Sequence, residues 1–495
     1  MASATLTRPR PGQPEAPARR RSSVPWPALA LAGLILGTAV GFVVRPTFPN
    51  YDSYYSLLWG REVLHGTLPS FDAYRAPTEH PLAIAFGALL SIVGDDADRI
   101  MVGATFASFV TLAAGMYRLG RASFTTVVGL IAAALVCTRF DFPFLAARAY
   151  IDIPYLALIV WAVALEADRS RRGTPVFALL AAAGLLRPEA WLLSGLYWLW
   201  CVLPATWPQR VKYTALAAIG PVVWPVVDWI VTGHPLFSLT HTTGLAEELG
   251  RTRGLSEIPQ ATVQFLKNLD KPPVFYAGVL GLVLAIVLVP KRIRWPLATF
   301  VIGMATFVLV GLAGLSVIDR YLLVPSLMVM VFAAVTLGGW SMLRAGRLRT
   351  AWAVAAGLVV LYGVAFTVTR VNLSTFDSEL LFRGQSHAAL EALFRNPKVR
   401  AAMRCGPVSV PNHKLVPDTR WVLKAGVDEV IARSDPASKP KLARGVAVYA
   451  TNRQALLRQG FTPEDSSTED IQNSLPMAGY TFVAASGFYG AYVRC

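Results

Sequence analysis

The sequence has few charged residues for its length. Asp, Glu, Lys and Arg make up 15% of its 495 residues, whereas a soluble globular chain carries about 25%. Hydrophobic residues make up 54%, and the mean hydropathy is +0.47. Apolar runs of about 17–25 residues, enough to cross a hydrocarbon core of about 30 Å, recur along the chain. The composition excludes an ordinary soluble domain and predicts a polytopic α-helical membrane protein.

Acidic residues are scarce relative to basic ones. The 30 Asp and Glu residues stand against 46 Lys and Arg, which gives a net charge of +16. A nucleic-acid binder would gather such an excess on one soluble face. Here the basic residues lie in small clusters between apolar runs, as the positive-inside rule requires. We interpret the excess as membrane orientation and expect no nucleic-acid partner.

Cysteine is also rare, with four residues in the chain. No CxxC motif or Cys/His spacing typical of a metal site is present. Cys137 and Cys201 fall in apolar runs and are expected to be buried, inert thiols. Cys405 and Cys495 lie in the polar C-terminal part and could form a disulfide if that part is outside the cytoplasm.

The order of apolar runs and charges predicts a topology. Residues 1–23, rich in Pro, Ala and Arg, are expected to be a disordered cytoplasmic tail. The run over 24–44 is long for a signal peptide and lacks a persuasive cleavage site, so it is expected to be retained as a helix. About eleven spans place every purely basic cluster inside. They are 24–44, 100–119, 124–138, 153–165, 176–186, 191–203, 213–231, 274–289, 295–315, 322–337 and 351–369.

Residues 81–94 are apolar but short for a span, at about 14 residues. If they crossed the membrane, Arg118 and Arg121 would face outside and the acidic run beginning at Asp95 would face inside. We therefore expect a partly embedded helix on the outer side. The long segment 234–273 is expected to be an outer loop. The membrane domain is expected to cover residues 24–370.

Residues 371–495 are expected to form a small extracytoplasmic α+β domain. The pattern predicts a helix over 386–403, strands over 407–410 and 446–449, a helix over 452–459 and a hairpin over 480–495. Thr451 is expected to cap the second helix. Val408 and Val410 could pair with the last strand, which would bring Cys405 close to Cys495.

One loop, residues 50–82, is unusually long, aromatic and charged with both signs. Apolar residues at helical spacing over 53–65 predict an amphipathic helix along the membrane surface, ended by Gly66 and Pro69. Glu62 is expected on its solvated face. Asp52 is the strongest candidate for a functional residue, with a helix N-cap as the alternative.

Other ionisable groups also fall at predicted outer helix ends, where charges are costly and typical of functional sites. Structural alternatives remain open for three groups. Arg148 and Asp152 could tie one helix end as an i, i+4 pair. Arg187 and Glu189 could fix two helices, and Arg320 with Tyr321 could be an interfacial anchor. The candidate substrate-binding residues are Tyr55, Glu79, His80, Arg148, Asp152, Arg187, Glu189, Arg320 and Tyr321.

Carboxylates and arginines at an outer membrane surface suit glycosyl transfer from a polyprenyl-phosphate sugar. The phosphate is already a good leaving group, so it needs cationic stabilisation rather than a general acid. One carboxylate, Asp52, would take the proton of the acceptor hydroxyl. A single base without a covalent intermediate implies inversion at the anomeric carbon.

Several residues at predicted outer helix ends and in the first loop follow a recognisable pattern: Asp52, Gly66, Glu79-His80-Pro81-Leu82, Asp152 and Arg320-Tyr321. In this pattern the sequence resembles the GT-C superfamily of membrane glycosyltransferases over residues 25–337, nearest the lineage of protein O-mannosyltransferases and lipid A aminoarabinose transferases. That resemblance implies a catalytic first-loop Asp and a nearby stretch at the lipid phosphate. The basic, Ala- and Arg-rich style resembles actinobacterial proteins thought to build cell-wall arabinan or mannan. The chain departs from the pattern in having Ser53 after the Asp and no second Pro after Pro81.

These observations favour an inverting hexosyl- or pentosyltransferase. His80, Arg148, Arg187 and Arg320 would bind the donor phosphate. Glu79 and Asp152 would position a glycan, lipid or protein acceptor or hold a divalent cation, and the need for a cation stays open. The C-terminal domain could bind glycan through His413, Trp421 or Tyr489, or act as a lid or stability element. The rival class is a transporter or flippase of lipid-linked sugars, whose usual sign, repeated halves with midplane charges, is not found. A non-enzymatic scaffold would not need acidic and basic groups around one loop.

Overall fold

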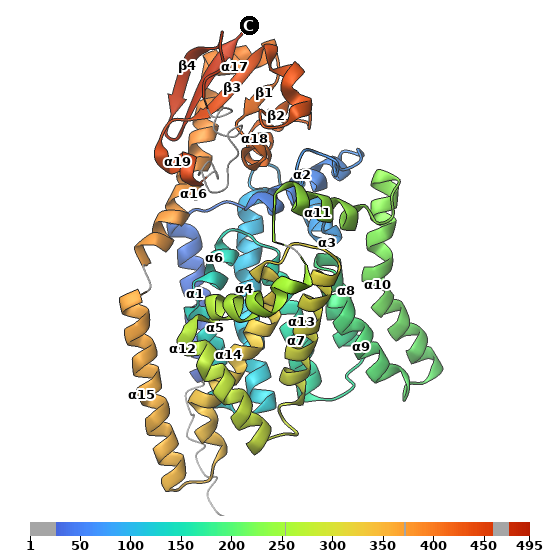
Figure 1. Ribbon diagram of the computed structural model, residues 1–495, viewed down its shortest axis with the longest axis vertical. Coiled ribbons are helices and arrows are strands. Elements are labelled where there is room, and N and C mark those ends of the chain that lie inside the picture. The colour runs from blue at the N-terminus through green and yellow to red at the C-terminus, as the bar shows by residue number, and fades with distance from the viewer. Residues whose placement is uncertain (1–25, 253, 371–372, 459–474) are drawn as a thin grey trace, which may run out of the picture.

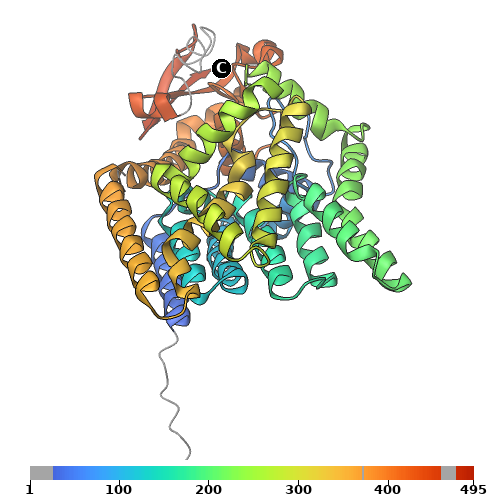
Figure 2. The same cartoon turned by 60° about the horizontal axis from the view of Figure 1, so that its bottom comes forward.

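The computed structural model describes residues 26–252, 254–370, 373–458 and 475–495. Figures 1 and 2 show a bundle of helices with a small sheet domain standing at one end and α10 at one edge. The predicted basic tail lies outside the described residues. The two-part architecture is the one that the apolar runs and the polar C-terminal part predict.

The helices of the bundle follow the apolar runs. Each predicted span coincides with a helix, and α3 covers the short run that was expected on the outer side. In chain order they are α1 (Trp26–Val44), α2 (Tyr51–Leu64), α3 (Pro81–Ser91), α4 (Ala97–Ser123), α5 (Thr126–Thr138), α6 (Asp141–Ala147), α7 (Asp152–Asp168), α8 (Thr174–Leu186), α9 (Ala190–Val202), α10 (Trp207–Thr232), α11 (Phe237–Glu248), η1 (Leu255–Glu257), α12 (Ile258–Leu288), α13 (Arg294–Leu312), η2 (Asp319–Leu322), α14 (Leu323–Gly338), η3 (Gly339–Met342) and α15 (Arg347–Arg370).

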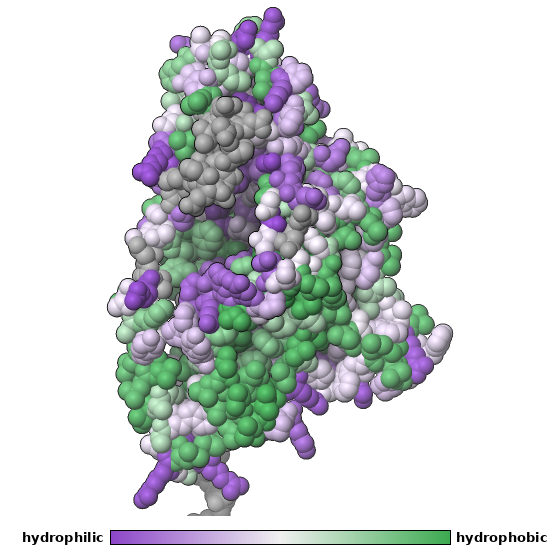
Figure 3. Space-filling model, viewed as in Figure 1, coloured by the Kyte–Doolittle hydropathy of each residue, from purple (hydrophilic) through white to green (hydrophobic). Residues whose placement is uncertain are grey.

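Among the described residues, seven helices are long and apolar enough to cross a membrane, or eight if the bent pair α5 and α6 is one span. The predicted number of about eleven is larger because α7, α8 and α9 have 17, 13 and 13 residues, fewer than the roughly 20 of a full span. Figure 3 shows apolar side chains spread over the bundle, with polar ones gathered at its lower edge and on the sheet domain.

The segment predicted as a loop over 234–273 is wrong in one respect, because it contains α11 and the first half of α12. Lys271 has a φ of 59°, and Pro272 and Pro273 follow it. The helix therefore breaks at this elbow instead of starting after it. In Figure 1 the first half of α12 crosses the bundle and the second half runs down it.

The helix α2, which carries Asp52, packs very closely against α3. A Cβ atom at Gly60 would lie 2.3 Å from the Ala88 backbone nitrogen, and one at Gly87 would lie 2.4 Å from the Ser56 carbonyl oxygen. No side chain fits between the two backbones at this crossing. Asn50 caps α2, because its side chain accepts a hydrogen bond from Ser53 N at 3.0 Å. The alternative in which Asp52 is the cap is therefore wrong.

The C-terminal domain is α+β, as predicted. Its sheet has the order β2-β1-β3-β5-β4, with β1 parallel to β2 and β3, and β5 antiparallel to β3 and β4. Its elements are α16 (Leu373–Arg395), α17 (Pro397–Ala402), η4 (Met403–Cys405), β1 (Val408–Val410), η5 (His413–Leu415), α18 (Val416–Leu423), β2 (Val430–Ala432), η6 (Pro436–Ala443), β3 (Gly445–Ala450), α19 (Arg453–Arg458), β4 (Thr481–Ser486) and β5 (Tyr489–Arg494).

Two details of this domain differ from the prediction. β1 does not pair with the last strand, because β3 lies between them. Asn452, rather than Thr451, caps α19, since its side chain accepts from Ala455 N at 2.9 Å. Residue 459, the predicted end of that helix, lies outside the described residues.

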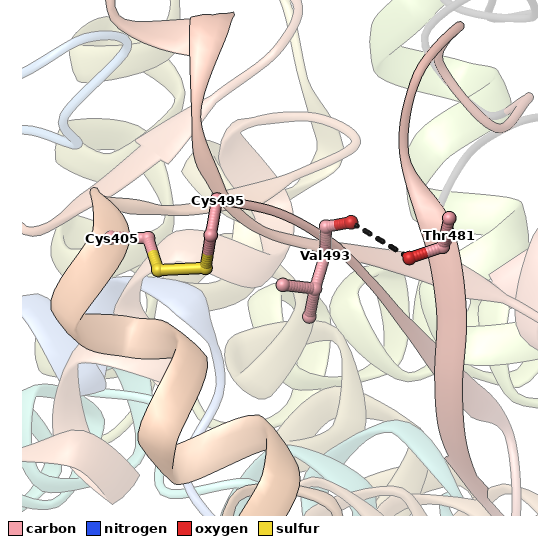
Figure 4. The surroundings of a disulfide bond; sticks show 4 residues. All are labelled: Cys405, Thr481, Val493 and Cys495. Atoms are coloured by element: carbon pink, nitrogen blue, oxygen red, sulfur yellow. Dashed lines mark hydrogen bonds between the residues drawn. A yellow bond between two sulfur atoms is a disulfide. The ribbon is translucent and has the colours of Figure 1, made fainter.

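The disulfide between Cys405 and Cys495 is confirmed, with Cα atoms 5.3 Å apart (Figure 4). It forms across β3: Gly406 packs against Arg444 and Gly445 at the start of that strand. Gly445 in turn pairs with Arg494 of β5. Cys137 and Cys201 are free, and the latter is buried.

The C-terminal domain docks directly onto α2. The Arg420 guanidinium binds the Glu62 carboxylate at 2.6 Å, and Ser70 N donates to the same carboxylate at 2.8 Å. The prediction of a solvated Glu62 is therefore wrong. The ring of His387 stacks on Phe48 with centroids 3.7 Å apart. As a result, α2 lies between α3 and the C-terminal domain, and both fix the position of Asp52.

Candidate active site

A cavity of about 960 Å³ lies where the loop after α1, the α10–α11 region, α13 and the C-terminal domain meet. Figure 3 shows the molecule hollowed between the sheet domain and the bundle. The cavity brings together seven of the predicted site residues from five separate stretches of chain. They are Asp52, His80, Arg148, Arg187, Glu189, Arg320 and Tyr321.

Five of the charged residues, here called the ion-pair relay, form one continuous chain. Arg320 donates to Asp52 at 3.2 Å and to Asp152 at 2.8 Å. Arg187 also binds Asp152, and it reaches Glu189 at 2.8 Å. The relay Asp52–Arg320–Asp152–Arg187–Glu189 therefore ties α2, η2, α7 and the α8–α9 turn together.

The relay decides between the alternatives that the sequence left open. Asp152 is fully buried and pairs with Arg187 and Arg320, so the i, i+4 pair with Arg148 is wrong. The pair between Arg187 and Glu189 is confirmed. Arg320 is more than an interfacial anchor, because it joins two carboxylates. Its neighbour Tyr321 lies with its ring 5.5 Å from the Arg187 guanidinium carbon.

Arg148 lies in the same cavity without a carboxylate partner. No ion pair to its side chain is found among the described residues, and its Nε is buried without a hydrogen-bond partner. The pKa of Arg148 is lowered to about 10, mainly by burial and to a lesser extent by the positive charge of the neighbouring Arg383. A half-buried cation without a carboxylate partner is incompletely compensated. This side chain is therefore ready to receive an anion.

Three predicted residues do not line the cavity: Tyr55, Glu79 and Asp152. Tyr55 is completely buried and packs against Trp59, with ring centroids 5.1 Å apart. It belongs to the packing beneath the site, and its substrate-binding role is not supported by its position. Asp152 acts through the two arginines that it holds.

Glu79 is buried, and the pKa values of Glu79 and its neighbour His80 are both shifted from their usual values. Burial raises the pKa of Glu79 to about 7, and neither of its carboxyl oxygens has a hydrogen-bond partner within the described parts of the chain. The pKa of His80 is lowered to about 3, mainly by burial and further by the positive charges of Arg187 and Arg320. His80 is therefore a neutral imidazole, so it can offer a phosphate an N–H group but no positive charge.

Replacing Glu79 by Gln is expected to stabilise the protein at pH 8 and to change its stability little at pH 4.5. The pKa of Glu79 is about 7 in the folded protein instead of the usual 4.5. The folded state therefore has its full stability below about pH 4.5, where Glu79 is protonated, and loses part of it as the pH rises through 7. The loss amounts to about 3 kcal/mol. Thermal unfolding of both proteins from pH 4.5 to 8 measures it. The exposed Glu257, changed to Gln, is the control. A Tm difference that does not vary with pH would contradict the expectation.

Glu79 and Asp152 do not fit a divalent cation. The guanidinium groups of Arg187 and Arg320 occupy Asp152 and would repel a metal ion. Across the described residues, no group of three His, Cys, Asp or Glu side chains is arranged to hold one.

Sequence reasoning missed the contribution of α10, α11 and the C-terminal domain to the cavity. Asp228, in an apolar helix, was a usable signal, because an ionisable residue in such a run marks a functional site by default. Of the three predicted glycan-binding residues, only His413 lines the cavity. Trp421 packs near Tyr54, and the Tyr489 hydroxyl lies 2.6 Å from Ser386 Oγ in the domain interior.

No family model and no curated protein sequence matches this chain. Solved structures do match it. ArnT from Cupriavidus metallidurans bound to undecaprenyl phosphate is 13% identical, with a TM-score of 0.54 over 94% of this chain and 97% of that one. The Archaeoglobus fulgidus oligosaccharyltransferase tethered with an acceptor peptide is 12% identical, with a TM-score of 0.50 over 95% and 74%. AglB of that organism, in complex with an inhibitory peptide and a dolichol-phosphate, gives the same values. The likeness confirms that this chain has the GT-C fold of polytopic membrane proteins, completed by a small α+β domain.

Proposed function

We propose that this protein is an inverting glycosyltransferase that moves a sugar from a polyprenyl-phosphate donor to an extracytoplasmic acceptor. The observation that carries the proposal is the ion-pair relay beside an unpaired Arg148 in one cavity. A carboxylate held by an arginine and a separate unpaired cation are the two groups that this reaction needs.

Asp52 acts as the general base. Arg320 donates to one carboxylate oxygen of Asp52 at 3.2 Å, and the Asp52 side chain remains 22% exposed beside the cavity. The acceptor hydroxyl donates its proton to Asp52 as its oxygen attacks the anomeric carbon. The bond from that carbon to the phosphate oxygen breaks on the opposite face, and the phosphate leaves with the electron pair. One displacement of this kind inverts the anomeric configuration.

Arg148 binds the departing phosphate. The other two arginines predicted for this role already bind carboxylates, Arg187 two and Arg320 two. Arg148 can therefore accept one negative charge without breaking an existing pair, which suits a phosphodiester. The leaving polyprenyl phosphate gains charge, so the contact strengthens as the bond breaks.

The lipid part of the donor would lie along the apolar wall of the cavity. This wall includes Leu309 and Val310 of α13, Ala313 directly after it, and Trp224 and Pro225 of α10. The bound lipids of two structural neighbours, undecaprenyl phosphate and a dolichol-phosphate, support this class of donor. The protein would reside in the cell membrane with its N-terminus in the cytoplasm and its C-terminal domain outside.

The sugar and the acceptor are also part of this proposal, and their assignment is supported by the basic, Ala- and Arg-rich style of the sequence, which resembles actinobacterial proteins. The proposed reaction is transfer of a mannose or arabinose unit to cell-wall glycan in an actinobacterium. A flippase of lipid-linked sugars is the less favoured function, because the ion-pair relay and the unpaired Arg148 meet at one cavity, as a transfer reaction requires.

The test is transfer of label from polyprenyl-phosphate sugars by the full-length protein in lipid nanodiscs. We expect release of polyprenyl phosphate and a product of inverted configuration. Arg148→Gln is expected to raise the KM for the donor about 10- to 150-fold, because charged hydrogen bonds contribute about 1.5–3 kcal/mol. Arg400, exposed on α17, gives the control variant Arg400→Gln. Passage of intact lipid-linked sugar across vesicle membranes, without release of polyprenyl phosphate, would overturn the proposal in favour of the flippase.

A further inference from the structure

Three basic side chains reach the cavity from segments far apart in the sequence. Arg75 follows α2, Arg251 follows α11, and Lys414 lies in η5 of the C-terminal domain. All three line the cavity together with His413. Their convergence depends on the docking of the C-terminal domain, because neither part of the protein alone contains all three.

His413 lies between two tyrosines at this place. Its ring meets the Tyr51 ring edge-on at 5.7 Å and the Tyr74 ring edge-on at 6.3 Å. Its Nδ1 is buried and lacks a hydrogen-bond partner in the described structure. The pKa of His413 is lowered to about 3, mainly by burial and further by the positive charges of Arg75, Lys414 and Arg251. The imidazole is therefore neutral.

The charges near His413 do not balance. Arg75 binds Glu248 at 2.8 Å, but no ion pair of Arg251 or Lys414 is found among the described residues. Two acids of the cavity are already occupied: Asp418 binds Arg383, and Asp228 accepts hydrogen bonds from Ser238. Glu379, a third acid that lines the cavity, is not free either. Two cations and one unpartnered nitrogen therefore face a cavity whose acids are engaged.

We propose that Arg251, Lys414 and His413 form an acceptor subsite that binds an anionic group, a phosphate or a carboxylate, carried by a glycan acceptor. Tyr51, which lines the cavity beside His413, would lie against the sugar ring and offer an apolar face beside the charged group. Arg251 and Lys414 would make the charge-assisted contacts. The inference rests on the proposed function, and it adds the chemical class of the acceptor.

The acceptor subsite and the proposed donor-phosphate site use different residues of the cavity. Arg148 stands directly after α6, whereas Lys414 and His413 belong to the C-terminal domain. The C-terminal domain thereby selects the acceptor, while the membrane domain holds the donor and the base. Neutral glycans would lack the group that Arg251 and Lys414 recognise.

A binding measurement tests the subsite without turnover. Saturation-transfer NMR on the full-length protein in nanodiscs would compare glucose 6-phosphate, glucuronic acid and glucose. We expect a stronger signal from at least one anionic sugar than from glucose, and the two anionic probes distinguish phosphate from carboxylate recognition. The double variant Lys414→Gln and Arg251→Gln should reduce the ratio of the anionic-sugar signal to the glucose signal at least tenfold. Lys398, exposed on α17, provides the control Lys398→Gln.

Two outcomes would overturn the inference. Equal signals from all three sugars would remove the anionic subsite. Loss of the anion signal in Arg148→Gln, with retention in the double variant, would place the anion at the donor site. If the wild-type protein transferred no sugar but still showed the preference, the proposed reaction would fail while the subsite stood. With transfer established, the double variant should raise the acceptor KM about tenfold.

Discussion

Replacing Asp52 by Asn should lower the rate of sugar transfer by about 10²–10⁴-fold, the usual contribution of a general base. The substitution keeps the size of the side chain but removes the negative charge that takes the acceptor proton. Arg320 keeps its other partner, Asp152, so the relay remains closed on that side. The loss should therefore appear in kcat, with Tm shifting by only a few degrees.

The matched control is Asp72→Asn, an exposed aspartate twenty residues further along the same loop. It should transfer sugar at the wild-type rate. Both variants are assayed with the same labelled polyprenyl-phosphate donor, and thermal unfolding verifies that each is folded. Full retained transfer by Asp52→Asn would remove Asp52 as the base, even if other substitutions in the cavity reduced activity.

Replacing Asp152 by Asn should destabilise the protein by about 3–5 kcal/mol, the cost of removing one partner from a buried charge pair. Asp152 is fully buried between Arg187 and Arg320. Without its charge, the two guanidinium groups would repel each other across a buried amide. Transfer activity should fall as well, because Arg320 would no longer hold Asp52 in a fixed position.

An ion pair of similar length at the surface supplies the comparison. Asp168 binds Arg118 at 3.1 Å, and both side chains are more than 40% exposed. Asp168→Asn should therefore cost at most about 1 kcal/mol. Thermal unfolding of the two variants in the same detergent measures the difference. Equal shifts would show that the relay contributes no more than a surface pair, and the positioning role of Asp152 would fall.

The sequence was sufficient to predict the candidate site residues at the ends of helices, because a charge beside a long apolar run stands out. Arg187, Glu189 and Arg320 were found in this way. The pairing among them was not predictable, since Arg320 and Asp52 are 268 residues apart and no local pattern encodes their contact. The nearer pair, Arg148 with Asp152, satisfied the helical spacing and was nevertheless wrong.

The prediction of the fold had similar limits. Spans were found wherever hydropathy was high, but the first half of α12 is polar enough to look like a loop before Pro272. β1 has only three residues, too few for its sequence to specify which strand lies beside it. The disulfide was anticipated through a pairing of β1 with the last strand that does not exist. The two cysteines still meet, because the segments that precede β1 and end β5 both lie beside the start of β3.

The glycine crossing of α2 and α3 limits how the protein can move. With Gly60 and Gly87 in backbone contact, these two helices cannot slide or rotate independently without a clash. Asp52 and His80, which they carry at their beginnings, therefore shift together or not at all. Any opening or closing of the cavity must therefore come from its other walls, the α11 segment and the C-terminal domain, while the Asp52 carboxylate keeps its distance from the His80 imidazole.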